Sequence, residues 1–199
     1  MSARRVVTGA TPDGKSVWAS DETIEPVRPI MLPGAIIHKL WGGDGVPELP
    51  HDGTPPEGLN YLPGPGGYRL YVYTVPPAMT YDGRKKVDRE EGLADLQRKL
   101  PGLTINPNSK NPGMHATDTV DFQIIVEGEV VLELDDGAEK VLKAGDVVVL
   151  NGDRHKWHNR SGVDATMVGI MIGARRDQPD SAAPSPAPSS LDRPGPANG

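Results

Sequence analysis

The sequence predicts an all-β protein folded as a closed antiparallel roll of two sheets, and two observations predict it. Short runs rich in β-branched and aromatic residues follow one another between Met114 and Ile172, each separated by a turn sequence. The 199 residues include 24 glycines and 21 prolines, which favours short strands joined by many turns over a helical bundle. Evenly spaced short strands of this kind form double-sheet rolls that close their own edges.

The N-terminal part predicts a hairpin and an arm. Arg4–Thr8 and Lys15–Ala19 are β-prone runs on either side of a Pro-Asp-Gly turn. The stretch from 25 to 65 is rich in Pro and Gly, and Ala35–Trp41 interrupts it as one expected strand. Tyr68–Val75 is dense in aromatic and β-branched residues, so it is expected to be the first strand of the main barrel.

The rest of the chain predicts one short helix, several strands and a tail. Leucines at spacings of three and four indicate an amphipathic helix over Arg89–Leu100, placed outside the barrel as a lid or brace. The strands expected after it are Phe122–Val126, Val130–Leu134, Lys140–Leu142, Val147–Leu150 and Thr166–Ile172. We therefore expect three parts: an arm over 1–66, a barrel over 67–173 and a disordered Pro/Ser/Ala tail over 174–199.

Composition excludes several classes of function. The net charge of −6 argues against nucleic acid or an anionic membrane as the main partner, because both would need a basic face. The chain has no cysteine, so a metal would be held by His, carboxylate or neutral oxygen ligands. We see neither a signal peptide nor a membrane-spanning stretch, and expect a cytoplasmic protein.

A row of polar residues opens the dense β segment. Side chains alternate between faces in an extended chain, so the following share one side: His115, Thr117, Thr119, Asp121 and Gln123. The opposite face is only partly apolar in its first half. The alternation therefore leaves open whether the polar row lines the interior or is a wet outer face.

A second polar segment lies between 151 and 159. If it is extended, His155, Trp157 and Asn159 share one face and His158 lies on the other. The two histidines of this segment are then not expected to bind one ion together.

These two segments together resemble the two-part signature of the cupin superfamily. The first part is filled by His115, Thr117, Asp121 and Gly128, and the second by Gly145-Asp146, Gly152, His155 and Asn159. The resemblance covers about a quarter of the chain. It implies a jelly-roll barrel, also called a double-stranded β-helix, with N-terminal strands and a short helix.

The resemblance also implies a metal site of variant composition. Thr117 stands where cupins usually have a second His, and Asp121 stands where they have Glu, which leaves His115, Asp121 and His155 as metal ligands. Two His and one carboxylate can hold a divalent ion such as Fe, Zn, Mn or Ni with positions open for substrate. The alternative is that the three residues form a metal-free hydrogen-bonded cluster in a ligand pocket.

Two functions follow from these alternatives. The first is a metal-dependent dioxygenase, isomerase, cyclase or lyase that acts on a small aromatic or polyketide-like molecule, with His155 and Asp121 as catalytic residues. The second is a non-catalytic binding protein with a degraded metal site. Residues expected to contact the small molecule are Thr117, Thr119, Gln123, Trp157, Tyr71, Tyr73 and Arg69. The resemblance also implies a homodimer.

Overall fold

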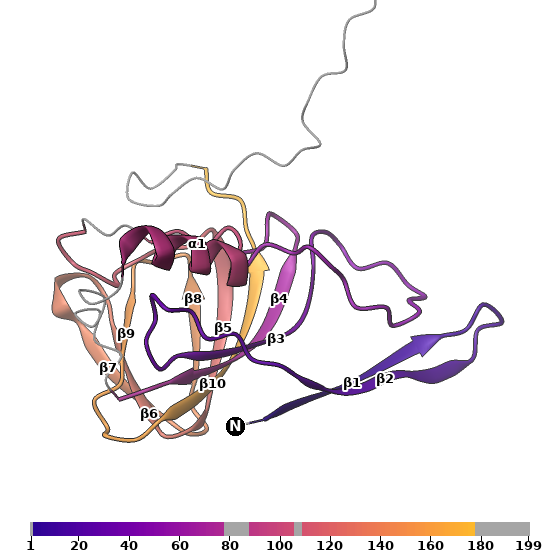
Figure 1. The fold of residues 1–199 in the computed structure, drawn as a ribbon, viewed down its shortest axis with the longest axis horizontal. Helices are drawn as coiled ribbons and strands as arrows, with labels where there is room; N and C mark the ends of the chain where they lie inside the picture. Colours follow the sequence, from indigo (N-terminus) through magenta and orange to yellow (C-terminus); the bar gives the residue numbers. More distant parts are fainter. Residues whose placement is uncertain (1, 78–87, 106–108, 178–199) are drawn as a thin grey trace, which may run out of the picture.

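A computed structural model describes residues 2–77, 88–105 and 109–177, and these form a predominantly β structure with one α-helix (Figure 1). The elements in chain order are β1 (Ala3–Ala10), β2 (Ser16–Ile24), β3 (Ile36–Gly43), β4 (Tyr68–Val75), α1 (Arg89–Lys99), β5 (Thr119–Glu127), β6 (Glu129–Glu133), a 3-10 turn (Asp135–Gly137), β7 (Glu139–Lys143), β8 (Val147–Asn151), β9 (Lys156–His158) and β10 (Ala165–Gly173). The predicted all-β class and the predicted helix are confirmed.

Two antiparallel sheets build the barrel. The larger has the order β3-β4-β10-β5-β8 and the smaller the order β7-β6-β9. A cluster of apolar side chains from both sheets fills the space between them, and its members are Val75, Ile125, Val130, Ala165 and Met167, with Tyr73, Leu142 and Trp157 packed against them. This arrangement is the jelly roll that the strand spacing predicts.

The larger sheet begins one strand earlier than expected. β3 pairs with β4 from Ile36 opposite Thr74 to Gly43 opposite Tyr68, so a segment of the predicted arm is an edge strand of the barrel sheet. The sequence places this strand correctly within the chain. Its partner follows from a pairing across about thirty residues, which local pattern does not reveal.

β1 and β2 form a separate two-stranded sheet that projects from the barrel (Figure 1). Its backbone returns to the arm at Ala10, whose amide donates to the His51 carbonyl at 2.8 Å. Gly9 and Gly53 face each other there, and a Cβ at Gly9 would lie 1.9 Å from the Asp52 carbonyl oxygen, so the close approach requires glycine.

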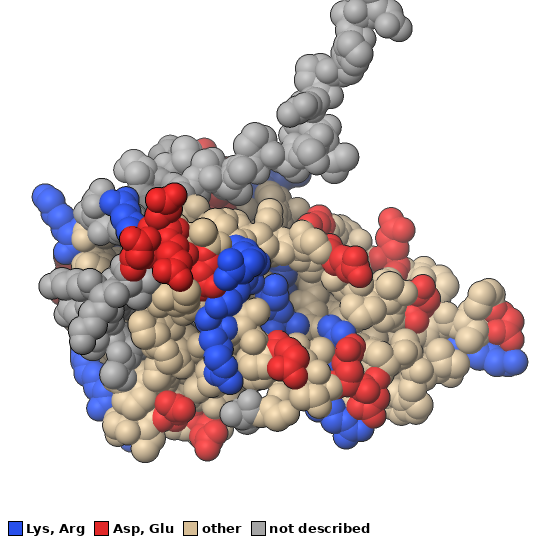
Figure 2. All heavy atoms as spheres, viewed as in Figure 1, with Lys and Arg blue, Asp and Glu red and all other residues tan. Residues whose placement is uncertain are grey.

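Helix α1 covers one end of the barrel and is held to the arm. Asp88 caps it by accepting from the Glu91 amide at 2.9 Å, and Leu96 and Leu100 pack on Ile37 of β3. The buried Asp95 carboxylate accepts from the Ile30 amide at 2.9 Å. On the face drawn in Figure 2, acidic and basic side chains are interspersed.

The ordered chain continues past the last strand. The Ala174 amide donates to the Asp118 carbonyl at 2.8 Å, so the four residues after 173 belong to the described structure. The expectation of disorder over 178–199 falls outside the described residues, and the three-part division stays a prediction. In the described ranges, no helix has the length and apolar character needed to cross a membrane.

Candidate functional site

The structure brings His115 and His155 together. Their backbones form an isolated antiparallel bridge, with the His115 amide donating to the His155 carbonyl at 2.9 Å and the His155 amide donating back at 2.8 Å. Residues directly opposite in such a pair project to the same face. The ring centroids consequently lie 4.4 Å apart at an interplanar angle of 54°.

Backbone carbonyls fix the same tautomer for both rings. His115 Nδ1 lies 2.8 Å from the Gly113 oxygen, and His155 Nδ1 lies 2.8 Å from the Asp153 oxygen. A carbonyl oxygen only accepts, so each Nδ1 carries the proton and each neutral ring keeps a lone pair on Nε2. Among the described residues, no hydrogen bond engages either Nε2. This is the arrangement in which histidine binds a metal ion through Nε2.

Both imidazoles are held neutral. Burial, together with the neighbouring His115, lowers the pKa of His155 to about 4, against smaller opposing effects of the Asp153 carbonyl and carboxylate. The pKa of His115 is also lowered, because protein atoms crowd the ring although part of it stays exposed. At neutral pH both rings are available as ligands, and His155 is a weak proton acceptor.

The polar row of β5 faces inward, which answers the question that the alternation leaves open. Thr119, Asp121 and Gln123 are each at most 4% exposed, whereas Val120 and Phe122 between them are half-buried on the outer side. Burial raises the pKa of Asp121, while hydrogen bonds from Thr119 and Gln123 oppose that rise. Asp121 is therefore a buried carboxyl group inside a largely apolar barrel.

The predicted ligand set does not form one compact group. In the part of the chain that the structure describes, the His, Asp and Glu ligand atoms that all lie within 4.8 Å of one another belong to Glu133, Glu139 and His158. That group includes none of His115, Asp121 and His155. The metal site of three residues accordingly stays a prediction, and the structure shows its two histidines in contact.

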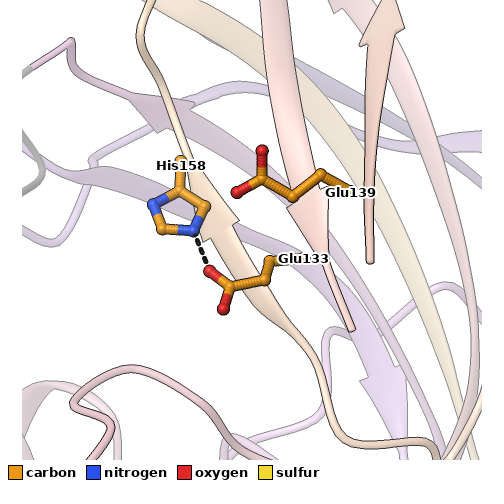
Figure 3. Close-up of side chains that lie close together, drawn as sticks. All are labelled: Glu133, Glu139 and His158. Carbon is orange, nitrogen blue, oxygen red and sulfur yellow. Dashed lines mark hydrogen bonds and ion pairs between the residues drawn. The ribbon is translucent and has the colours of Figure 1, made fainter. Parts of the chain in front are cut away.

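Glu133, Glu139 and His158 lie close together (Figure 3). Trp157 of β9 packs on the apolar cluster, so its neighbour His158 lies on the outer face, as the alternation predicts. The members of this group are already paired: His158 Nε2 contacts Glu133 Oε2, and the Arg160 guanidinium donates to both oxygens of Glu139 at 2.7 and 2.8 Å. Each of the two carboxylates thus already has a partner within the protein.

Three tyrosines border the polar row. The Tyr61 hydroxyl donates to the Tyr73 hydroxyl at 3.0 Å, and Tyr71 stacks on Tyr61 at 5.0 Å while donating to its carbonyl at 2.8 Å. Burial raises the pKa of Tyr73 well above its usual value, and the charges of Tyr61, Tyr71 and Asp121 add to the rise. Tyr73 borders the polar row at Gln123, because a Cβ at Gly169 would contact both side chains. Tyr61 was not among the residues predicted from sequence.

The other predicted contact residues have structural partners. Arg69 is 1% exposed, and its guanidinium donates to the carbonyls of Asn60, Gly43 and Tyr68 and pairs with Asp44. Trp157 packs on the apolar cluster and meets His155 edge-on at 6.1 Å. Thr117 Oγ1 lies 2.7 Å from Thr119 Oγ1. The binding of a small molecule by these three side chains stays a prediction.

Asn159, the last residue of the second motif, holds a loop closed. Its Nδ2 donates to the carbonyls of Val75 and Val163 at 2.7 Å, and its Oδ1 accepts from Ser161. The side chain ties β4 to the connection between β9 and β10. Its spacing from His155 therefore reflects the fold rather than ligand binding.

Arg176 is a positioning residue that sequence reasoning missed. Its Nη2 donates to the carbonyls of Thr117 and Gly152 at 2.9 Å each, and its Nε pairs with Asp118. It thereby joins the segment that carries His115 to the loop that carries His155. No local sequence signal identifies it, because it lies within the segment that the sequence predicts to be a disordered tail.

A surface cavity of about 460 Å³ lies away from these residues, near the turn between β5 and β6. It is lined by Thr74, Glu127, Gly128, Val163, Asp164 and Thr166. None of the predicted site residues borders it.

The jelly roll, the facing histidines and the inward carboxyl are the features that the resemblance to cupins implies. Residues 103–172 match the family described as the cupin domain, so this segment of the chain is a cupin domain of the type-2 kind. The expected resemblance is confirmed for this segment.

Within the superfamily, the similar curated proteins are fungal. Phomopsin biosynthesis cluster protein C' of Diaporthe leptostromiformis is 46% identical over 48 residues, covering 24% of this chain and 25% of that protein. The cupin-domain-containing oxidoreductase virC of Hypocrea virens is 39% identical over 66 residues, covering 33% of each. The matches thus span about a quarter to a third of these relatives.

Solved structures with similar folds are remote in sequence. A putative ethanolamine utilization protein Q of Salmonella typhimurium is 9% identical with a TM-score of 0.42, covering 88% of this chain and 99% of that one. A cupin 2 conserved barrel domain protein of Salinispora arenicola is 19% identical with a TM-score of 0.37, covering 70% and 76%.

Proposed function

We propose that the protein is a metal-dependent enzyme of the oxidoreductase type that acts on a small organic molecule in the cupin barrel. The observation that carries the proposal is the His115–His155 pair, in which each Nδ1 is held by a backbone carbonyl and each Nε2 keeps its lone pair. The naming of three fungal relatives as cupin-domain-containing oxidoreductases supports the reaction class.

The donor chemistry of the histidine pair fits a divalent ion. Imidazole nitrogens bind iron, zinc and nickel, and two of them leave most coordination positions for water and substrate. A bound iron ion would supply redox chemistry, and a zinc ion would polarise a carbonyl oxygen. The chain's own contribution is to hold both rings neutral and oriented, through Gly113, Asp153 and the Arg176 bridge.

Substrate orientation is assigned to the inward polar row. Thr119, Asp121 and Gln123 offer buried hydroxyl, carboxyl and amide groups beside the apolar cluster, and Tyr73 adds an aromatic face. A small molecule with polar substituents on an apolar frame matches such surroundings. Aromatic or polyketide-like compounds are the class we propose.

Element analysis of the purified full-length protein tests the proposal. We expect near-stoichiometric iron, zinc, manganese or nickel in the wild type and in His158→Ala, and at least a tenfold lower content in His115→Ala and His155→Ala. The His158 variant is the matched control, because its ring lies on the outer face of the same segment. Equal metal in all four proteins would contradict the assignment.

A second candidate is a metal-free protein that binds a small molecule without converting it. It is favoured by Thr117 in place of the usual second histidine and by the separation of Asp121 from the histidine pair. Absence of metal after reconstitution, together with recovery of an unchanged bound metabolite, would select this function.

We also propose that two copies associate through the outer face of the larger sheet. Val147, Val149 and Ile172 are 58%, 47% and 42% exposed there, and an apolar exposed face of this kind favours association. A sedimentation run should give a dimer mass at micromolar concentration for the wild type and a monomer mass for Val149→Asp. A monomer mass for the wild type would contradict the proposal.

A further inference from the structure

Two buried oxygen atoms in the polar row have no hydrogen-bond partner among the described residues. They are Asp121 Oδ1 and Gln123 Oε1, on side chains that are 3% and 4% exposed. Both face inward from β5, two residues apart. A buried acceptor without a donor is unfavourable, so such a pair marks a place where another molecule donates hydrogen bonds.

The neighbouring strand is shaped around one of these acceptors. Gln123 stands opposite Gly169 of β10, which in turn stands opposite Tyr71 of β4. A Cβ at Gly169 would lie 2.7 Å from Tyr73 Cε2 and 2.8 Å from Gln123 Oε1. The missing side chain at Gly169 thus lets the amide oxygen lie beside the Tyr73 ring.

The aromatic surroundings are rigid. Tyr73 contacts Tyr71 edge-on at a centroid distance of 5.7 Å, and its hydroxyl accepts from Tyr61. The hydroxyl proton of Tyr73 is thereby directed away from Tyr61. A flat ring beside these side chains would meet both an aromatic edge and two unpaired acceptors.

We propose that Asp121 and Gln123 form a subsite for the hydroxyl groups of a dihydroxylated aromatic compound, and that Asp121 binds substrate rather than metal. Alternate residues of one strand lie about 6.6 Å apart, a span that two hydroxyls on one ring can serve through converging side chains. This inference rests on the proposed function, because it assigns the substrate class of the same site.

The location of the carboxyl group supports this role. Asp121 lies on the same inward face of β5 as Gln123, and among the described residues it forms no compact ligand group with His115 and His155. A carboxylate accepts charge-assisted hydrogen bonds from phenolic hydroxyls, and these are stronger than bonds between neutral groups. The histidine pair then holds the ion, and the carboxyl and amide oxygens hold the ring that reacts beside it.

The test compares two probes that share a ring and two oxygens, of which only one has donor hydrogens. Resorcinol has two hydroxyls, whereas 1,3-dimethoxybenzene keeps the ring and both oxygens without a donor. Calorimetry on the full-length wild type should show at least tenfold tighter binding of resorcinol. Asp121→Asn and Gln123→Leu should each reduce that preference about tenfold while retaining the wild-type metal content. His158→Ala, which removes a ring on the outer face, is the matched control and should retain the preference.

Each contrary result has a defined meaning. Equal affinity for the two probes, or no binding of either, would overturn the dihydroxylated class. Loss of metal in Asp121→Asn would overturn the substrate role and assign the carboxylate to the ion. A wild type that contains no metal but still prefers resorcinol would refute the proposed metal-dependent function and leave this subsite standing.

Discussion

Two histidine clusters lie on opposite faces of the segment 155–158, and they differ in whether a charged side chain pairs with their members. On the outer face, His158 contacts Glu133 (Figure 3), and Arg160 forms an ion pair with Glu139, so each carboxylate has a partner. On the inner face, the Nδ1 atoms of His115 and His155 are held by backbone carbonyls, and the rings contact each other and Trp157. A cluster with its charges paired supports the fold, whereas neutral rings with free lone pairs are available for chemistry.

The largest expected effect is on stability in acid. The unfolded chain protonates His155 near pH 6.5, whereas the folded protein does so only near pH 4, so the unfolded state binds more protons between these values. The free energy of unfolding of the metal-free protein should therefore fall as the pH drops through this window, by on the order of 3 kcal/mol from this group. Urea unfolding with chelator present measures it.

The control for this pH dependence is the outer histidine. His155→Gln removes the titrating ring and should flatten the profile between pH 6.5 and 4, while His158→Gln should retain most of the slope. The groups acting on His155 are His115 and Asp153, so both stay unchanged in these variants. A slope that vanishes in His158→Gln instead would reverse the comparison.

The next effect is stabilisation by added metal. An ion that binds only the folded state at 100 times its Kd stabilises by about 2.7 kcal/mol, which raises the Tm of a chain of this size by roughly 5–10 °C. Thermal unfolding with added zinc or iron should show this rise in the wild type and in His158→Ala, but not in His155→Ala. A rise that persists in His155→Ala would place the ion elsewhere.

A smaller effect is expected from Arg176, which joins the two segments of the inner cluster. Arg176→Ala removes donors to the Thr117 and Gly152 carbonyls and should lower metal affinity about 10-fold, as loss of an outer support for a ligand does. Competition with a chromogenic chelator measures the affinity. Arg160→Ala, which removes a comparable guanidinium from the outer cluster, should leave the affinity unchanged.

The sequence predicts the inner cluster only in part, for physical reasons that differ by residue. The strands of the barrel are predicted by their β-branched runs. The start of β5 at Thr119 is not, because Thr119 and Asp121 are polar although they face inward. The facing of His115 and His155 depends on a pairing across forty residues, so only the resemblance to cupins links them. No local sequence pattern predicts the hydrogen bonds of Arg176 or the position of Asp121 relative to the histidines, because both depend on tertiary structure.

The smallest effect concerns the outer pair itself. Glu133 and His158 are 17% and 20% exposed, so their hydrogen bond should contribute about 1 kcal/mol. A double-mutant cycle with Glu133→Gln and His158→Ala, read by urea unfolding at pH 7, should give a coupling energy of that size that falls with added salt. If zinc stabilises the wild type and Glu133→Gln abolishes that stabilisation, the outer cluster binds the ion. Charge pairing would then not distinguish a structural cluster from a metal site.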